Sequence, residues 1–401
     1  MKMKIGLISS LYPPYILGGA EIIVKKTAEW LVRKGHEVFV ITTSPDRKAF
    51  TETVRGVKVY RINPINVYTM YNHQRQLEIL KPIWHGIDIW NPHSYIIVKS
   101  VLEKEKPDIV HVHNFKGLSL SVFSAVKRLN LPLMFTAHDY SLICPRANLL
   151  RRSGEICSDP SPLCKAYAKV QKFLVDSKSD LVTAPSQFVI DKLREAGLFR
   201  NVRTIKLPLG IEINDKKPEK GYETIEVLYV GNLSRHKGLH VLIKAFKELK
   251  FENVRLHVVG KGKDESEFRM MAKSDPRIIF HGFLPEKELL QLYQKANVTV
   301  APSIWYETFG LIILESFSCG TPVVGSKIGA YKDLIEEGIN GYLFEAGNAY
   351  QLKKILEYLI ENPAELRRLE NGAIESVKKY DIRKYIETLE ELFKEVRANY
   401  V

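Results

Sequence analysis

Short apolar runs alternate with longer amphipathic stretches along most of the 401 residues. Runs of four to seven apolar residues that end in Gly, Pro or polar residues are typical of buried parallel strands. The pattern predicts strands at 5–9, 37–42, 108–113, 133–137, 180–184, 202–207, 225–231, 254–259, 277–281, 298–301, 322–325 and 340–345. It predicts helices at 21–34, 118–129, 165–178, 186–196, 286–294, 349–361, 363–378 and 382–397. Strands that alternate with helices in this way indicate an α/β protein with parallel sheets.

The length and the position of the linker residues predict two domains. A chain of 401 residues suits two α/β domains of about 200 residues each, and each is large enough to bury its own core. Residues 1–207 form the first predicted domain, 208–224 a polar linker with Pro208 and Pro218, and 225–381 the second domain. Residues 62–95 follow no period and are rich in aromatic side chains, so we expect an irregular segment there, either functional or packing.

Two carboxylates flank the predicted start of a helix in the second domain. Glu307 precedes the helix that we expect to begin near Phe309-Gly310, and Glu315 lies two turns further along a similar face. The amides and the positive dipole at a helix N-terminus favour an anion such as a phosphate. The spacing fits two carboxylates that serve one ligand, and it fits equally well a capped helix whose Glu315 is paired with a lysine.

Other polar residues stand where strands end. Gly18-Gly19 lies at a helix start, where glycines allow close backbone approach to a phosphate or sugar, although a tight turn without a ligand is commoner. His138 follows the strand at 133–137, and ligands of open α/β sheets bind beyond such strand ends. Arg235 and Lys237 stand at a helix entrance and suit a diphosphate, or else are solvated cations.

Several of these motifs together resemble glycosyltransferase family 4. The resemblance rests on the two glutamates with Phe309-Gly310 between them, on Cys319-Gly-Thr-Pro-Val-Val324, and on Lys237-Gly238. It implies the GT-B fold, in which two Rossmann-like domains with parallel sheets face each other across a cleft that holds the site. It also implies that the helix at 382–401 packs back on the first domain. Asn232 departs from the family pattern, which has an arginine there, and Arg235 is the candidate substitute.

The resemblance also implies roles for single residues. Gly18, Gly19, Arg235 and Lys237 would bind the donor diphosphate. Glu315 would bind the ribose, with Gly282 and Leu284 beside the base. Glu307, with Phe309, Gly310 and Leu311, would hold the sugar, and His138 would contact it. Glu307 and His138 would be the catalytic residues. Members of the family generally need no metal, and this chain has no Asp-x-Asp motif for a nucleotide-bound metal.

The function that the resemblance implies is retaining glycosyl transfer. The donor would be a UDP- or GDP-linked sugar and the acceptor a saccharide or a lipid-linked molecule, in the synthesis of cell-surface glycans or glycolipids. A phosphorylase or a sugar-nucleotide epimerase of the same fold is the first alternative. A binding protein without catalysis is the second. A phosphorylase would require added phosphate, whereas a binding protein would bind its ligand without turnover.

Three of the four cysteines lie within 21 residues of one another. Cys144, Cys157 and Cys164 fit free buried thiols, a disulfide, or a structural zinc site that takes a fourth ligand such as Asp159 or His138. Their spacing matches no common zinc motif. Four cysteines in this length argue against a secreted disulfide framework.

The net charge is concentrated in the first half of the chain. Residues 1–215 carry 31 Lys and Arg against 19 Asp and Glu, or +12, whereas residues 216–401 carry 28 against 27, or +1. Such asymmetry predicts that the first domain meets an anionic partner, and an anionic membrane surface is the leading candidate. The chain has no signal-peptide pattern, no long apolar run and no nucleic-acid motif. We therefore expect a cytoplasmic enzyme, peripheral on the inner face of the membrane, that binds no nucleic acid.

Overall fold

The computed structural model describes residues 2–16, 18–213 and 220–400, apart from the side chains of residues 73–75. The chain divides into two compact units, which we call the first and the second unit. The first unit consists of residues 1–148, 158–208 and 385–401, and the second of residues 149–157 and 209–384. Part of the predicted linker, residues 214–219, lies outside the described residues.

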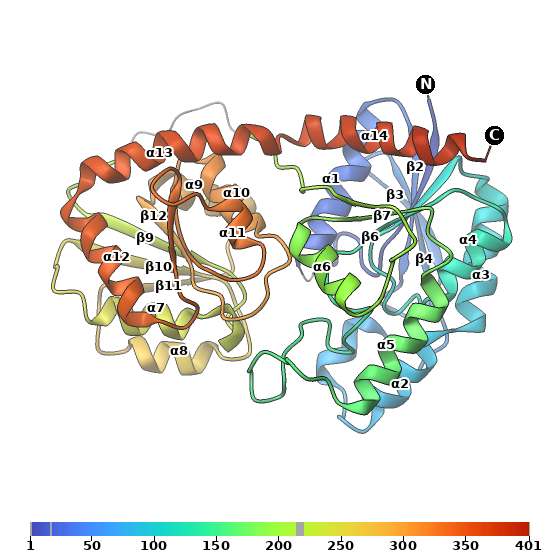
Figure 1. The fold of residues 1–401 in the computed structure, drawn as a ribbon, viewed down its shortest axis with the longest axis horizontal. Helices are drawn as coiled ribbons and strands as arrows, with labels where there is room; N and C mark the ends of the chain where they lie inside the picture. The colour runs from blue at the N-terminus through green and yellow to red at the C-terminus, as the bar shows by residue number, and fades with distance from the viewer. Residues whose placement is uncertain (1, 17, 214–219, 401) are drawn as a thin grey trace. The chain divides into compact units, whose positions relative to one another are not determined.

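The first unit is built on an eight-stranded sheet (Figure 1). Its strands are β1 (Lys4–Ile8), β2 (Glu37–Thr43), β3 (Phe50–Val54), β4 (Val57–Ile62), β5 (Ile109–Val112), β6 (Leu133–Thr136), β7 (Leu181–Ala184) and β8 (Thr204–Lys206). They lie in the order β3-β4-β2-β1-β5-β6-β7-β8. All neighbours are parallel except β3 and β4, which form an antiparallel hairpin. The strands β1, β5, β6 and β7 are almost wholly buried, as their continuous apolar runs predict.

Helices connect these strands. They are α1 (Gly19–Arg33), the 3₁₀ helix η1 (Met70–Arg75), α2 (Leu80–Ile89), α3 (Pro92–Glu105), α4 (Ser121–Arg128), α5 (Pro162–Val175) and α6 (Gln187–Glu195). Helix α1 buries Ile23, Val24, Ala28 and Leu31 at the helical spacing, so its polar residues remain on the outer side.

The C-terminal helix α14 (Ile382–Ala398) contacts the first unit from Tyr385 onward. His36 Nε2 lies 2.6 Å from Glu390 Oε1, and Arg397 Nη2 lies 2.8 Å from Asp108 Oδ1. The ring of Phe393 packs edge-on against His111, with 5.5 Å between centroids. These contacts join the end of the chain to residues of β2, β5 and their loops.

The prediction that residues 62–95 are irregular is wrong. The segment contains η1 and α2 and leads into α3, and the preceding hairpin β3–β4 was also not predicted. In α2 the buried side chains are Trp84 and Asp88, whereas Ile83 and Ile87 are exposed. The isoleucines therefore do not mark the buried side of this helix, and pattern reading misses the helix.

The second unit is built on a six-stranded, fully parallel sheet. Its strands are β9 (Ile225–Val230), β10 (Val254–Val259), β11 (Ile278–Gly282), β12 (Val298–Ala301), β13 (Val323–Ser326) and β14 (Gly341–Phe344), in the order β11-β10-β9-β12-β13-β14. The helices are η2 (Arg235–Lys237), α7 (Leu239–Lys247), α8 (Glu265–Ala272), α9 (Glu286–Lys295), α10 (Leu311–Ser318), α11 (Tyr331–Leu334), α12 (Ala349–Glu361), α13 (Pro363–Val377) and η3 (Lys378–Tyr380). The predicted strands and helices of this half are confirmed within a few residues, and α8 and α11 were not predicted.

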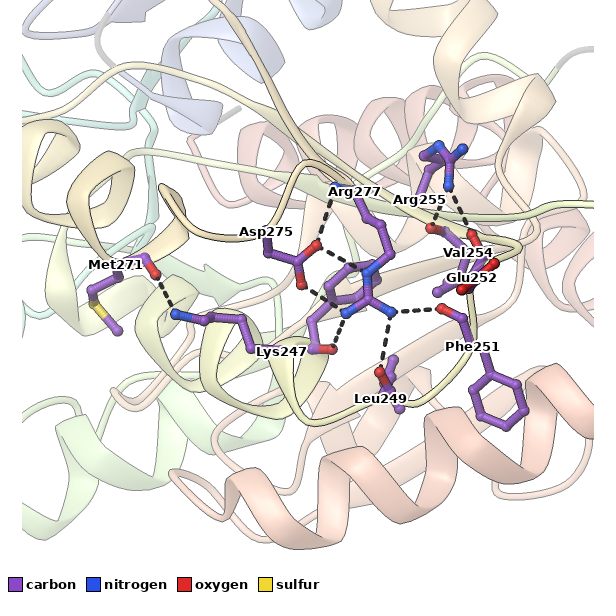
Figure 2. Close-up of polar contacts among 10 residues, drawn as sticks. Lys247, Leu249, Phe251, Glu252, Val254, Arg255, Met271, Asp275 and Arg277 are labelled. Carbon is purple, nitrogen blue, oxygen red and sulfur yellow. Dashed lines mark hydrogen bonds and ion pairs between the residues drawn. The ribbon is translucent and has the colours of Figure 1, made fainter.

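The end of α7 is held by Arg277, at the start of β11 (Figure 2). The guanidinium donates to the carbonyl oxygen of Phe246 in α7 at 3.4 Å and to those of Leu249 and Phe251, just beyond the helix, at 3.1 and 2.6 Å, and it forms an ion pair with Asp275 at 2.7 Å. Buried carbonyls at a helix end need donors, and a planar guanidinium supplies several at once. This contact fixes the far end of the helix whose first turn follows Lys237.

In both sheets the order in which successive strands are added reverses near the centre. In the first unit the reversal lies between β1 and β5, and in the second unit between β9 and β12. Parallel α/β sheets bind ligands beyond the strand carboxyl ends at such a reversal. The loops that follow these four strands are therefore the places in which to look for function. No helix among the described residues is both long enough and apolar enough to cross a bilayer.

Candidate active site

Glu307 lies in the loop between β12 and α10, at the reversal of the second sheet. Its side chain is buried, and three donors converge on its Oε1 atom. These are Lys237 Nζ at 2.8 Å, Trp305 Nε1 at 2.7 Å and the hydroxyl of Ser303 at 2.5 Å. The loop after β9 supplies Lys237 and the loop after β12 supplies the other two, so the two central strands of the sheet bring the group together.

Glu307 is held in its ionised form. Burial by itself would raise the pKa of this carboxyl group, but the charge of Lys237 and the hydrogen bonds to Oε1 outweigh burial. The net result is a pKa below the ordinary value for glutamate. A buried carboxylate that keeps its charge provides a fixed negative potential in a place of low dielectric constant.

Lys237 is positioned by the glycine that follows it. Gly238 has a φ of 77°, and a Cβ atom there would lie 1.7 Å from the carbonyl oxygen of Pro302. Only glycine allows this approach of the two loops. The Lys237 ammonium also lies 4.8 Å from the centroid of the Trp305 ring, which adds a cation–π contact. The structure thus brings together two residues, Lys237 and Glu307, that were predicted separately.

Arg235 has different contacts. Its guanidinium forms an ion pair with Glu267 of α8, and its backbone amide donates to Asp264. More than half of the Arg235 side chain is exposed. The structure therefore places the two predicted diphosphate cations in different surroundings, with Lys237 on the buried carboxylate and Arg235 on a surface acid.

The residues predicted to bind ribose and base lie around Tyr293. The hydroxyl of Tyr293 donates to Glu315 Oε2 at 3.1 Å. Leu284 packs on the small apolar cluster that contains Tyr293 and Cys319. Gly282 ends β11, and its carbonyl accepts a hydrogen bond from Gly260 at 2.8 Å. Glu315 and Leu284 thus share one neighbour at this side of the unit.

Three residues predicted to bind the sugar, Phe309, Gly310 and Leu311, stand at the start of α10. Gly310, with a φ of 128°, precedes the helix, and Leu311 is its first residue. The ring of Phe309 is buried and lies 6.2 Å from the ring of Tyr380. The side chain of Phe309 therefore belongs to the core, which leaves backbone groups as the means by which Phe309 can reach a ligand.

Gly18 and Gly19 stand at the start of α1 in the first unit. The amide of Gly18 donates to Glu21 Oε2 at 2.7 Å, in the arrangement of a capping box. This amide is therefore already used by a side chain of its own helix. Asn114, beyond β5, approaches the other oxygen of Glu21 at 3.5 Å, so the loops at both sides of the reversal meet there.

His138 is buried beyond β6 and is linked to a second histidine. His138 Nε2 lies 2.9 Å from His113 Nδ1, and the ring of His111 follows at 3.9 Å between the centroids of His111 and His113. Burial lowers the pKa of His138 to about 4, and burial together with the charge of His138 lowers that of His111 to about 3. Burial also lowers the pKa of His113, so all three rings are neutral at pH 7.

The hydrogen bonds also indicate the tautomer of His138. His113 Nε2 is buried and has no partner among the described residues. A buried N–H without an acceptor is costly, so we place the proton of His113 on Nδ1, which then donates to His138 Nε2. His138 must then carry its own proton on Nδ1 and can donate from that atom.

The zinc hypothesis is not supported by the arrangement of the cysteines. Cys144, Cys157 and Cys164 are free and partly exposed. Among the described residues, no group of three or more His, Cys, Asp or Glu side chains is placed to hold a metal ion. The proposed fourth ligands are engaged elsewhere, since Asp159 pairs with Lys165 at 2.9 Å and His138 bonds to His113. Cys319 is buried.

Sequence reasoning missed the residues that support the predicted ones. Ser303, Trp305, Tyr293 and His113 each hydrogen-bond to a predicted site residue, and none of them was singled out. Trp305 and Ser303 stand beside Glu307 in the chain, but a polar loop has no period from which side-chain directions can be read. His113 follows a strand, and this position is the one signal that pointed to it.

Two family models together match nearly the whole chain. The model for Glycosyltransferase Family 4 matches residues 17–214, and that for Glycosyl transferases group 1 matches residues 210–398. An uncharacterized glycosyltransferase of Methanocaldococcus jannaschii is 28% identical over 396 residues, covering 90% of this chain and 92% of that protein.

Solved structures resemble the chain over almost its full length. Sucrose-phosphate synthase from Thermosynechococcus elongatus has a TM-score of 0.78 and 21% identity, and the match covers 99% of this chain and all of that one. Anabaena HepE in complex with UDP-glucose has a TM-score of 0.74 and 20% identity, covering 98% of this chain and all of that one. At this identity the likeness shows a common fold.

Proposed function

The chain belongs to glycosyltransferase family 4, the group 1 glycosyl transferases, and from this premise we propose the reaction that it carries out. We propose retaining transfer of a hexosyl group from a UDP- or GDP-linked sugar to a saccharide or a lipid-linked acceptor. The observation that carries the proposal is the buried pair of Glu307 and Lys237 at the reversal of the second sheet. The UDP-glucose bound by the similar HepE supports a nucleotide-sugar donor.

Lys237 binds the donor diphosphate in this proposal. Cleavage of the donor leaves a nucleoside diphosphate, and a cation beside its leaving oxygen stabilises the charge that develops there. Lys237 is suited to this because its ammonium is partly exposed, while Glu307 and the Trp305 ring hold it in place. We assign the diphosphate to Lys237 before Arg235, whose charge is already paired with Glu267.

Glu307 acts on the sugar. A retained negative charge near the anomeric carbon favours the positive charge that develops in glycosyl transfer. Its three donors hold the carboxylate in one orientation, so little reorganisation is needed during the reaction. In this proposal the amides of Gly310 and Leu311, at the start of α10, assist in binding the sugar hydroxyls.

The remaining residues orient the donor. Glu315 accepts hydrogen bonds from the ribose hydroxyls, and Tyr293 holds its carboxylate. Leu284 and the backbone of Gly282 lie beside the base. In the first unit, neutral His138 donates from Nδ1 to a sugar hydroxyl, and the loop at Gly18 and Gly19 borders the ligand without supplying the Gly18 amide.

A panel of nucleotide sugars tests the proposal. Purified protein should be stabilised against heat by one UDP- or GDP-linked sugar and by the matching nucleoside diphosphate, because ligands that bind the folded state raise its stability. The stabilising donor should then release its diphosphate faster when saccharide or lipid-linked acceptors are added. Release that requires inorganic phosphate would instead indicate a phosphorylase, and binding without any release would indicate a binding protein.

A further inference from the structure

Helix α5 of the first unit exposes an apolar stripe. Leu163, Ala166, Val170 and Phe173 are all exposed, and Leu163 and Phe173 keep 83% of their surface. At 100° per residue these positions fall within an arc of about 80° on one side of the helix. The opposite side is anchored, since Gln171 is buried and donates to the carbonyl of Ser141 at 3.1 Å. The stripe is therefore not the side that packs on the core.

Lysines run beside this stripe. Lys165, Lys169 and Lys172 recur at the i, i+4, i+7 spacing and lie next to the apolar side of α5. The helix contains no acidic residue. Lys165 and Lys172 have nearby carboxylates outside the helix, at 2.9 Å in Asp159 and 3.2 Å in Asp176. The helix itself thus presents an apolar ridge beside a cationic one.

Helix α2 carries a second exposed apolar row. Ile79, just before the helix, and Ile83 and Ile87 within it recur every four residues and are 76%, 51% and 36% exposed. The acid of this helix, Asp88, is buried on the opposite side. The helix therefore leaves this row of isoleucines outward, where an ordinary surface helix has polar side chains, and buries its one negative group beside Trp84.

Hydrogen bonds bring the C-terminal ends of α2 and α5 to the same residue of α4, and both helices appear at the same end of the first unit in the view of Figure 1. Ser124 of α4 accepts from Trp90 Nε1, at the end of α2, at 3.4 Å, and from Lys178 Nζ, just beyond α5, at 2.9 Å. We call the exposed residues of the two helices the α2–α5 surface: Ile79, Ile83, Ile87, Leu163, Ala166, Lys169, Val170 and Phe173. The second unit also exposes apolar side chains, such as Met270, Phe283, Ile339 and Tyr350, but these lie on several different elements.

We propose that the α2–α5 surface docks on an anionic lipid bilayer. Exposed apolar side chains enter the boundary between headgroups and acyl chains, and flanking lysines attract anionic headgroups. The excess of +12 in residues 1–215 acts in the same direction. A second copy of the chain fits less well, because α5 against α5 would bring two rows of lysines together without an acid on either helix.

The inference goes beyond the proposed function and does not require it. It would explain how the enzyme reaches a lipid-linked acceptor, yet docking can be measured without donor or acceptor. Failure of the docking experiment would leave glycosyl transfer to a soluble saccharide untouched, and failure of glycosyl transfer would leave the docking result untouched.

Co-sedimentation with vesicles tests the docking surface. The full chain should bind vesicles of phosphatidylglycerol and phosphatidylcholine, bind less as salt rises, and bind pure phosphatidylcholine weakly. Leu163→Ser combined with Phe173→Ser should lower partitioning about 10-fold or more, because two apolar side chains no longer enter the bilayer. Lys169→Glu should lower binding to the anionic vesicles only.

Matched variants in the second unit serve as controls. Met270, on α8, is 77% exposed, and Lys273, just after α8, is also exposed, so Met270→Ser and Lys273→Glu should bind vesicles as the wild type does. Thermal unfolding of each variant checks that it is folded. Three results would overturn the proposal: no vesicle binding by the wild type, equal binding to neutral and anionic vesicles at every salt concentration, or wild-type binding by the double variant. A dimer that the Leu163 and Phe173 substitutions abolish, in the absence of vesicle binding, would also overturn it and would assign the surface to a second copy.

Discussion

The buried side chains at the reversals of strand order in the two sheets differ in charge. In the second unit Glu307 is buried but has a cation and two further donors, so it keeps its charge. In the first unit His111, His113 and His138 are buried, and among the described residues their rings hydrogen-bond only to one another and to a threonine hydroxyl, so they stay neutral. The reversal of strand order that both sheets share thus lies beside a charged group in one unit and beside neutral hydrogen-bonding groups in the other.

This difference shows that topology and charge are determined by different residues. The order of strands decides where a loop can meet a ligand. The partners of each buried group then decide its protonation state.

The largest expected effect is at Glu307. Glu307→Ala should lower kcat about 100-fold or more, because the stabilisation it gives is needed in the transition state. The affinity for nucleoside diphosphate should change little. Steady-state kinetics with the donor identified in the panel gives kcat, and calorimetric titration gives the affinity. Glu286→Ala, an exposed glutamate of α9, is the control, and wild-type turnover by the Glu307 variant would remove that residue from the mechanism.

A large effect is also expected at Lys237. Lys237→Ala should weaken binding of the nucleoside diphosphate by roughly 1.5–3 kcal/mol, which corresponds to the loss of a charged hydrogen bond. Glu307 would also lose its cation in this variant, so Lys237→Arg is the better test of charge alone and should retain part of the affinity. Titration of each variant with UDP and GDP measures this. Unchanged affinity in the alanine variant would refute the assignment.

The neutral histidines of the first unit should change the stability of the fold by a free energy similar in size to this loss of affinity. The unfolded chain takes up protons on histidine below about pH 6.5, whereas His111 does so only near pH 3. The unfolded state therefore binds more protons between these values, and stability falls as the pH falls. For one such histidine the loss is about 1.4 kcal/mol per pH unit, or about 2 kcal/mol at pH 5.

Urea unfolding at pH 7 and pH 5 checks this prediction. The difference in unfolding free energy between the two pH values should shrink by about 2 kcal/mol in His111→Gln. Thr136→Val removes the hydroxyl that lies 2.6 Å from His111 Nε2 but adds no titrating group, so it should lower stability equally at both pH values. An unchanged pH dependence in the glutamine variant would show that His111 titrates normally in the folded chain.

The smallest effect is expected at Arg235. Because its guanidinium pairs with Glu267 and is largely exposed, Arg235→Ala should change diphosphate affinity less than about 3-fold. The same titrations measure it beside the Lys237 variants. A loss as large as that of Lys237→Ala would mean that Arg235 leaves Glu267 to bind the diphosphate, as the resemblance to the family first suggested.

The alternation of strands and helices was predictable because buried parallel strands give continuous apolar runs. The strands on both sides of each reversal, such as those before Gly18 and Glu307, were expected within one or two residues of their ends. Helix α2 was not, because it buries Trp84 and Asp88 and exposes isoleucines. A pattern of hydrophobic positions predicts an element only where the apolar side faces the core.

For the site, sequence reasoning found the charged residues but not their supports. Lys237 and Glu307 were each expected at the donor site through the resemblance to the family, but their direct contact was not. Neither the donors Ser303 and Trp305 nor the contact between Gly238 and Pro302 could be read from the chain, because they depend on how two loops fold against each other. The cysteines show the opposite case, because closeness in sequence suggested a zinc site, whereas no metal-binding group of side chains is found in the part of the chain that the structure describes.

The central claim is that Lys237 binds the donor diphosphate while Glu307 stabilises the transition state. Single-turnover kinetics tests this claim most directly. The rate of sugar transfer is measured against donor concentration for the wild type, Lys237→Ala and Glu307→Gln. The account predicts that the lysine variant needs much more donor to reach its limiting rate. It predicts that the glutamine variant binds donor nearly as the wild type does and that its limiting rate is reduced by about 100-fold or more. Equal losses of binding in both variants, with limiting rates unchanged, would contradict it.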